Sequence, residues 1–592
     1  MAGSKVKAVA AAQGEGSVRN IMESAPRGRK SLLHRYVPIT AWLPAYRREW
    51  LASDTIAGLT AWTLAVPLAM AFAGIAGVPV QYGLYAACLA PVGYALFGTS
   101  RHLNVGPAAT VAAISAATVM SLADVGTQRY LTLTVALALM VGALLILGGL
   151  ARGGFIAKFL ARPVLDGYIV GTAIFIAVGQ LDKIFGITAD GGNTFAKFAD
   201  LFRQAGSWSW TTIAVGAACL LSLYAMRKAV PRIPAALTVM VLSILAAYLL
   251  KLGEHGVALV GEIPRGLSGL SLAGIGVRDV VRLLPGAFAL ALFAFAESLA
   301  FAKVYAARHS YRIDANQEMI GLGAANLGAG ILRGFPVDAS FTRTAATEQA
   351  GGRTELAAVI CSVLTITTLF LFTGFFKYLP QATLAAIVIF VVSNLIDLRP
   401  FARFRRSSRP DFALALGTLF GVLVFGVVIG ILIGVVLSLA GFFLRSSRPH
   451  SAVLGVDESG TRHGDIAERP ECSPYSPHLI IYRFDAPLIF SNVDEFVGDI
   501  RDLVEEADLK PLAVIVDCEM IYEMDTTATD DLQELHAGLT RESIDVYLAR
   551  VHAPVLSFMR LDGVVDFVGE ENVFRTVRDA VQAFRERHPD PS

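Results

Sequence analysis

The stretch Leu332–Thr347 (LRGFPVDASFTRTAAT) and the earlier stretch Phe97–Thr110 (FGTSRHLNVGPAAT) interrupt apolar sequence in the same way. Each follows a predicted helix rich in Gly and Ala. Each then holds a short extended piece, around Val105 in one and Val337 in the other, before a helix of small residues begins. The similarity predicts that the chain is built from two related halves.

The sequence around these stretches is that of a polytopic membrane protein. The chain has 592 residues, of which 54% are hydrophobic, a composition typical of helical membrane bundles. We predict about fourteen transmembrane helices, at residues 53–74, 80–97, 106–121, 130–150, 163–181, 209–226, 235–251, 284–306, 316–332, 341–352, 355–375, 380–393, 411–427 and 429–444.

The two interrupted stretches fall in the third and tenth of these helices, which are matching positions in halves of seven. Because seven is odd, the halves are expected to have opposite orientations in the membrane. Basic residues gather in the loops that follow even-numbered helices, as in residues 399–409 (RPFARFRRSSR), which places those loops inside the cell. We therefore expect both termini to be cytoplasmic and the protein to lie in the plasma (cell inner) membrane.

Charge divides the chain into domains. Residues 1–450 carry 38 Lys and Arg against 20 Asp and Glu, whereas residues 451–592 carry 12 against 29. The expected organisation is a disordered cytoplasmic tail, a transmembrane domain, a linker and a small acidic domain, at residues 1–36, 37–445, 446–477 and 478–592 respectively.

Arg343 begins the apolar helix of the second interrupted stretch. An arginine at membrane depth is costly and by default functional. If the two short helices meet with their N-termini facing, their free N–H groups and partial positive charges attract an anion, and Arg343 adds a forked donor. We predict an anion site formed by Arg343 with Ser340, Thr342, Thr344, Gly106 and Ala108. The alternative is a structural arginine that binds the carbonyls of a broken helix.

Glu297 is the lone acid deep in the predicted helix 284–306. A carboxylate removed from water favours its neutral form, so it can load and release a proton. We predict that an anion beside Arg343 lets Glu297 take up a proton, which couples the two fluxes. The alternative is a static Glu–Arg pair that leaves transport uncoupled.

Several motifs resemble the sulfate permease (SulP) family: WLPAYRREWLASDTIAGLTAW (Trp42–Trp62), VPVQYGLYAACLAP (Val78–Pro91), DANQEMIGLGAANLGAG (Asp314–Gly330) and ASFTRTA (Ala339–Ala345). The resemblance implies a bundle of seven-plus-seven inverted repeats, divided into a core and a gate, that works as a homodimer by an elevator motion. It also implies that Glu297 is the proton-coupling residue and Arg343 the anion-binding residue.

One stretch departs from the sulfate-type pattern. Many such members carry a glutamine and an aromatic hydroxyl in the first helix near the anion, whereas AVPLAMAFAG (Ala65–Gly74) has Leu68 and Phe72 there. The leading prediction is H⁺-coupled uptake of an inorganic anion, with sulfate favoured. Bicarbonate or C4-dicarboxylate transport, and an uncoupled anion channel or exchanger, remain alternatives.

Residues 478–590 alternate strand and helix patterns and resemble the STAS domain that ends most SulP proteins. Thr526 and Thr527 lie where related anti-sigma antagonist domains carry a phosphorylatable residue, although helix capping by Asp525 or a threonine is the favoured role. A cytosolic protein partner would bind this domain. The alternative function is that of a membrane-anchored signalling protein.

The chain has no motif for a nucleotide loop, a catalytic triad or a zinc site, and its five cysteines are scattered. We therefore expect no enzyme activity, cofactor, metal or nucleic-acid partner. The expected partners are an anion, H⁺, the lipid bilayer and a second copy of the chain.

Overall fold

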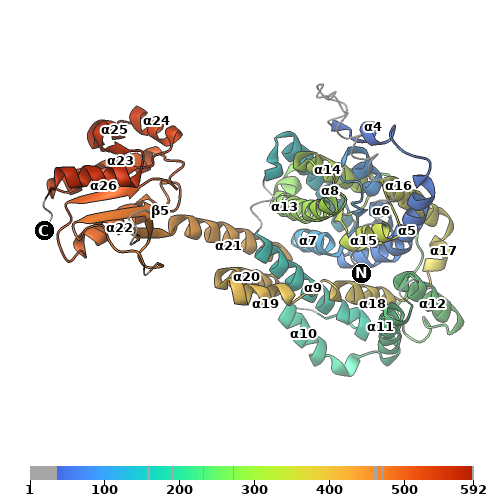
Figure 1. Cartoon of the computed structure of the whole chain (residues 1–592). Coiled ribbons are helices and arrows are strands. Elements are labelled where there is room, and N and C mark those ends of the chain that lie inside the picture. The colour runs from blue at the N-terminus through green and yellow to red at the C-terminus, as the bar shows by residue number, and fades with distance from the viewer. Residues whose placement is uncertain are drawn as a thin grey trace, which may run out of the picture. The chain divides into compact units, whose positions relative to one another are not determined.

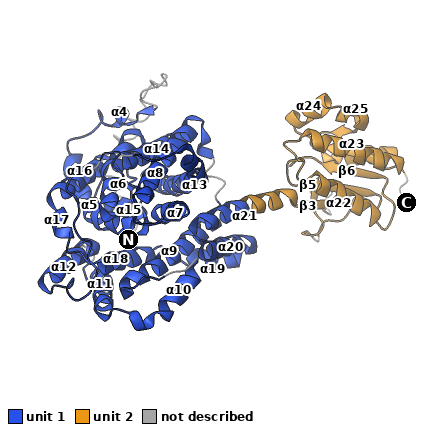
Figure 2. Cartoon of the chain, turned by 180° about the vertical axis from the view of Figure 1, so that it is seen from behind, with its two compact units in different colours: residues 1–438 blue, residues 439–592 orange. Residues whose placement is uncertain are grey.

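The computed structural model describes residues 36–155, 161–189, 193–230, 233–267, 269–270, 272–457, 463–469 and 471–589. The chain forms two compact units, residues 1–438 and 439–592, which are coloured separately in Figure 2. The expected N-terminal tail lies outside the described residues except for Tyr36.

The first unit is helical. Its helices are α4 (Ile39–Trp42), α5 (Trp50–Ile75), α6 (Val80–Phe97), α7 (Ala109–Met120), α8 (Gln128–Leu150), α9 (Arg162–Phe185), α10 (Thr194–Arg203), α11 (Trp210–Ala229), α12 (Ala235–Leu249), α13 (Val277–Arg308), α14 (Ala315–Ile331), α15 (Phe341–Gln349), α16 (Leu356–Leu371), α17 (Thr373–Phe376), α18 (Gln381–Ser393), α19 (Arg399–Ser407), α20 (Arg409–Phe425) and the start of α21 (Val427–Ser447).

Each of the fourteen predicted ranges contains a helix, and the range 355–375 contains two, α16 and α17. The apolar stretches of the sequence thus predicted the positions of the helices, because a backbone surrounded by apolar side chains and lipid must form its own hydrogen bonds. By length and composition, seven helices of the described part could cross a membrane; they are α5, α6, α8, α9, α11, α13 and α21. Helices α7, α12, α16 and α18 are apolar but shorter.

Figure 1 shows the first unit as two groups of helices. In one group α14 packs on α8 and α6, and α13 packs on α8 and α7. In the other group α9 packs on α20 and α18, and α18 packs on α11. Small residues allow the close approach inside a group: a Cβ added to Gly83 of α6 would lie 1.9 Å from the carbonyl oxygen of Ala69 in α5.

Both interrupted stretches contain a short strand between two helices. Strand β1 (Val105–Gly106) precedes α7, and β2 (Asp338–Ala339) precedes α15. Pro107 and Pro336 flank these strands, and proline removes a backbone donor that a continuous helix would need. The two strands form an antiparallel pair in which Val105 faces Ala339 and Gly106 faces Asp338. The prediction that both stretches hold an extended piece is confirmed.

The second unit is a six-stranded sheet with helices. The strand order is β4-β3-β5-β6-β7-β8, and β5 to β8 are parallel. Its elements are β3 (Ser451–Val456), β4 (His463–Asp465), β5 (Leu479–Phe484), α22 (Val493–Glu505), β6 (Ala513–Asp517), α23 (Thr526–Arg541), β7 (Asp545–Ala549), α24 (Ala553–Leu561), α25 (Val564–Val568), β8 (Val573–Phe574) and α26 (Val577–Arg587).

The structure differs from the expected linker at residues 446–477. Strands β3 and β4 lie in this segment, and β3 pairs with β5. The side chains of Ala452 and Leu454 are buried in the core of the sheet. The strands are short and lie among proline and glycine residues, so their alternation is too brief to stand out from a loop.

Candidate functional site at the half-helix crossing

The two interrupted stretches lie against each other inside the first unit. Besides the β1–β2 pair, the backbone N–H of Ser340 donates to the carbonyl of Asn104 (2.9 Å), and the N–H of Asn104 donates to Thr344 Oγ1 (3.0 Å). We call residues 104–110 and 337–344 the half-helix crossing. Because β1 and β2 run antiparallel, α7 and α15 leave the crossing in opposite directions, with both N-termini facing it.

A side chain from α14 holds the second strand in place. Asn326 donates through Nδ2 to the carbonyl of Val337 (2.9 Å), and its Oδ1 accepts from the N–H of Val337 (3.0 Å). The N–H of Ala339 donates to Ser298 Oγ of α13 (3.0 Å). These side chains replace the ladder partners that a two-residue strand lacks.

The N-termini of α7 and α15 supply the polar groups of the crossing. The first N–H groups of a helix have no partner within the helix and carry partial positive charge. Ala108 is the N-cap of α7, and Ser340 is the N-cap of α15, where its hydroxyl accepts from the N–H of Arg343 (3.4 Å). Ser340 and Thr342 are at least partly exposed, so the first turn of α15 is not fully covered by the rest of the described chain.

Arg343 lies on the first turn of α15, and its side chain is 1% exposed. Its Nη1 donates to the carbonyl of Pro107 (2.7 Å), and its Nε donates to Asn104 Oδ1 (3.1 Å). In the described part of the chain, Nη2 has no hydrogen-bond partner. A Cβ on Gly106 would lie 3.0 Å from Nη2, so the missing side chain of this glycine leaves room for the guanidinium.

Arg343 therefore combines the two roles that the sequence left open. Two of its nitrogens tie the second half-helix to the first interrupted stretch, as a structural arginine does. The third nitrogen is a buried donor without an acceptor, and such a group has a strong tendency to bind one.

The other predicted contact residues divide into two sets. Gly106 and Ala108 lie on the first stretch at the crossing, and Ser340 and Thr342 lie on the first turn of α15. Thr344 is buried, and its hydroxyl accepts from Asn104, so it fastens the crossing.

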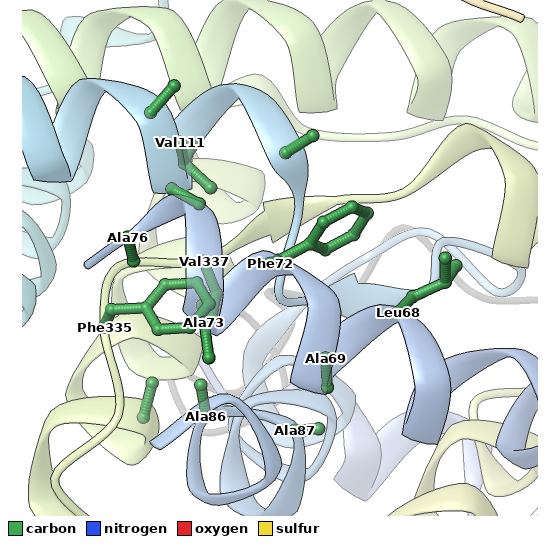
Figure 3. Close-up of a cluster of buried hydrophobic side chains, with 14 of the residues drawn as sticks. Leu68, Ala69, Phe72, Ala73, Ala76, Ala86, Ala87, Val111, Phe335 and Val337 are labelled. Atoms are coloured by element: carbon green, nitrogen blue, oxygen red, sulfur yellow. The ribbon is translucent and has the colours of Figure 1, made fainter. Parts of the chain in front are cut away.

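Leu68 and Phe72 lie one turn apart on α5 and are each 3% exposed (Figure 3). Figure 3 draws them beside Ala69 and Ala73 of the same helix, with Phe335 and Val337 of the second stretch nearby. They belong to the same buried cluster, so the first-helix wall near the crossing is apolar, as the sequence predicts.

Glu297 lies on α13 next to the crossing. Thr110 Oγ1 of α7 donates to Glu297 Oε2 (3.3 Å). The hydrogen bonds of Arg343 go to Asn104 and Pro107 instead. The structure thus places Glu297 beside the crossing, and its hydrogen bond is with Thr110.

Sequence reasoning missed Asp338 and Asn104. Both lie inside the two interrupted stretches. The signal available for Asp338 was an acid three residues before the first residue of α15. Asn104 gave no such signal, because an asparagine in a loop usually forms local turns.

In the second unit, Asp525 is the N-cap of α23, and its Oδ1 accepts from the N–H of Ala528 (2.9 Å). This confirms the capping role that the sequence favours. Thr526 and Thr527 follow it on the first turn and are exposed.

Interrupted helices that meet at a short β-contact, inside a bundle of apolar helices, are the arrangement found in membrane transporters with discontinuous helices. Comparison with known proteins agrees with this class. The model of the sulfate permease family matches residues 51–418, and the STAS domain model matches residues 473–580. The chain belongs to the sulfate permease family; it is a multi-pass membrane transporter with a C-terminal STAS domain and not an enzyme.

Two relatives illustrate the similarity in sequence. A probable sulfate transporter of Mycobacterium tuberculosis is 35% identical over 92% of this chain and 97% of its own length. The chloroplastic sulfate transporter 4.1 of Arabidopsis thaliana is 32% identical over 92% of this chain and 82% of its own length.

Two solved structures share the fold. The murine solute carrier 26 family member A9 anion transporter, in its inward-facing state, gives a TM-score of 0.87 at 20% identity, covering 96% of this chain and 98% of that chain. The transmembrane domain of the cyanobacterial bicarbonate transporter BicA gives 0.59 at 22% identity, covering 66% and 98%.

Proposed function

We propose that this chain is a secondary active transporter of inorganic anions that takes up sulfate together with protons. The observation that carries the proposal is the β1–β2 contact, which turns two helix N-termini toward one place and sets the unpartnered Nη2 of Arg343 beside them. The names of the two relatives support sulfate as the anion.

The anion would bind against the first turns of α7 and α15. Backbone N–H groups and one guanidinium suit a tetrahedral oxyanion, because its oxygens accept from several directions. Because Arg343 is almost completely buried, substrate entry requires the helices around the crossing to separate. The two groups of helices in Figure 1 suit an elevator motion in which the group with the crossing moves against the group of α9, α11, α18 and α20.

Glu297 would carry the coupled proton. It lies beside the crossing, is partly exposed, and has a neutral hydroxyl donor in Thr110. The active form would be a homodimer in the plasma membrane with both termini in the cytoplasm, and the STAS domain, with its exposed Thr526 and Thr527, would bind a cytosolic protein.

Bicarbonate is the second candidate substrate. The apolar side chains of Leu68 and Phe72 favour it, because they remove two polar contacts that would help to hold sulfate. The same wall suits a C4-dicarboxylate, which has an apolar middle.

Uptake of radiolabelled sulfate into proteoliposomes, with an inward proton gradient, tests the function. We expect uptake that exceeds empty vesicles and falls when the gradient is removed. Unlabelled sulfate, bicarbonate and dicarboxylates compete in the same assay. Labelled sulfate uptake no higher than in empty vesicles, together with uptake of labelled bicarbonate, would make bicarbonate the leading candidate.

Arg343→Ala tests the site, with Arg312→Ala as the matched control, because Arg312 is an exposed arginine in the loop between α13 and α14. We expect Arg343→Ala to lose binding of every anion, and Arg312→Ala to keep it. Equal anion affinity in the two variants would contradict the assignment.

A further inference from the structure

The three nitrogens of the Arg343 guanidinium are used unequally. Nε donates to Asn104 Oδ1 (3.1 Å) and Nη1 donates to the carbonyl of Pro107 (2.7 Å), whereas Nη2 has no partner among the described residues. A guanidinium is planar and presents two forks of donors, one formed by Nε with Nη2 and the other by Nη1 with Nη2. Each fork of Arg343 therefore has one of its two nitrogens occupied.

Other arginines of the described chain show how the first fork binds an anionic group. In four ion pairs away from the crossing, Nε and Nη2 of one arginine both donate to the same carboxylate; the pairs are Arg399 with Asp397, Arg483 with Asp485, Arg550 with Asp517 and Arg560 with Glu570. An oxyanion binds such a fork in the same way, with one oxygen on each nitrogen. At Arg343, the amide oxygen of Asn104 already takes the place of one of these two oxygens.

Asn104 is held in this place by its own backbone. Its N–H donates to Thr344 Oγ1 (3.0 Å), its carbonyl accepts from the N–H of Ser340 (2.9 Å), and the residue is 3% exposed. The side-chain atom that faces Nε must be the oxygen, because every nitrogen of a guanidinium is a donor. A short side chain on a fixed backbone thus keeps one acceptor against Arg343.

Both acceptors of the Arg343 side chain are neutral. An amide oxygen and a backbone carbonyl orient the guanidinium without cancelling its charge, whereas a carboxylate in the same place would do both. The positive charge therefore stays available to an anion. Because Nε and Nη1 are engaged, the nitrogen that an anion can reach without displacing a protein group is Nη2.

We propose that Asn104 is a positioning residue that limits Arg343 to a contact of one nitrogen with the anion. This rests on the proposed function. The forked donor that the sequence predicts is then reduced to Nη2, and the other contacts of the anion come from the first N–H groups of α7 and α15. A contact through one nitrogen gives no advantage to an anion with two neighbouring oxygens over a monatomic anion. Asn104 thereby weakens the preference of the site for oxyanions.

Asn104→Ala tests this inference through the relative affinities for sulfate and chloride. Alanine removes the acceptor, so Nε can join Nη2 in binding a second sulfate oxygen, which a chloride ion does not have. We expect the preference for sulfate over chloride to rise about three- to tenfold, the effect of one more hydrogen bond. The measurement is equilibrium binding of radiolabelled sulfate to the purified full chain, displaced by unlabelled sulfate or by chloride at constant ionic strength.

Two further variants separate this role from a purely structural one. Asn326→Ala is the matched control, because Asn326 also holds the crossing but binds Val337 and not Arg343; it should weaken the binding of both anions and leave the ratio of their affinities unchanged. Asn104→Asp keeps the shape and the contact with Nε but cancels the charge of Arg343. We expect it to lower the affinities for both anions at least about tenfold.

An unchanged or lower preference for sulfate in Asn104→Ala overturns the proposal, as does a folded Asn104→Ala chain that binds no sulfate. Wild-type affinity in Asn104→Asp also overturns it, and this variant decides if gel filtration shows that Asn104→Ala does not fold. If the wild-type chain binds radiolabelled bicarbonate but not sulfate, the substrate in the proposed function is wrong, and the ratio of bicarbonate to chloride affinity then tests Asn104. Binding of none of the three anions overturns both proposals.

Discussion

Asn326→Ala is the change that tests how the half-helix crossing is held. Asn326 is 0% exposed and binds both the N–H and the carbonyl of Val337, immediately before β2. Alanine leaves both backbone groups buried without partners. Each such group costs about 1–3 kcal/mol, so we expect a loss of about 2–6 kcal/mol in the free energy of unfolding of the first unit.

The five tryptophans make the measurement specific. Trp42, Trp50, Trp62, Trp208 and Trp210 all lie in the first unit, so tryptophan fluorescence during SDS titration in mixed micelles reports that unit alone. The matched control is Asn394→Ala, since Asn394 is exposed and binds the carbonyl of Phe390; it should change the free energy by less than about 1 kcal/mol.

The same variant should also weaken anion binding, because β2 positions the first turn of α15. We expect a lower affinity in equilibrium binding of radiolabelled sulfate, with the folded fraction checked by gel filtration. A loss of stability no larger than that of Asn394→Ala would refute the reasoning, since Val337 would then have to be held by other groups.

Two further predictions concern the second unit. Asp517 is 0% exposed and accepts from two nitrogens of the partly exposed Arg550. Asp517→Ala should therefore destabilise β6 by about 2–3 kcal/mol, which we expect to see as faster hydrogen exchange of residues 513–517 than in wild type. Unchanged exchange would exclude a structural role for the pair. Burial lowers the pKa of His536 below its ordinary value of 6.5, so the folded unit binds fewer protons than the unfolded chain and loses stability as the pH falls below that value. Thermal unfolding followed by circular dichroism at about pH 7.5 and about pH 5.5 should show a smaller pH effect in His536→Phe, and an identical effect would contradict the assignment.

Much of the fold could be predicted because the relevant forces act on local sequence. A run of apolar residues in a membrane must form a helix so that its backbone N–H and C=O groups have hydrogen-bond partners. The structure accordingly has a helix in every range that the sequence predicted. Helices α10 and α19 were missed. The polar and aromatic residues of α10 resemble a loop, and the basic residues 399–409, which were expected to form a loop, contain α19 because their positive charge hides the helical pattern. The family motifs and the alternating pattern of residues 478–590 identified both domains.

The site was predicted only in part. Arg343 and Glu297 were found because charge at membrane depth is conspicuous. The partners of Arg343 could not be predicted, because Asn104 and Pro107 lie more than two hundred residues away and contact it only through the β1–β2 pair.

By itself, the sequence determined that the chain is a helical membrane protein with two similar interrupted stretches, an arginine and a glutamate in apolar helices, and an acidic domain at its end. These properties follow from composition and periodicity, which are local. Only the tertiary structure decided that the guanidinium of Arg343 turns toward Asn104 and Pro107 in the other half, and that its Nη2 has no hydrogen-bond partner among the described residues. Those contacts depend on how distant segments pack, and side-chain hydrogen bonds act over a few ångströms, so no local pattern can encode them.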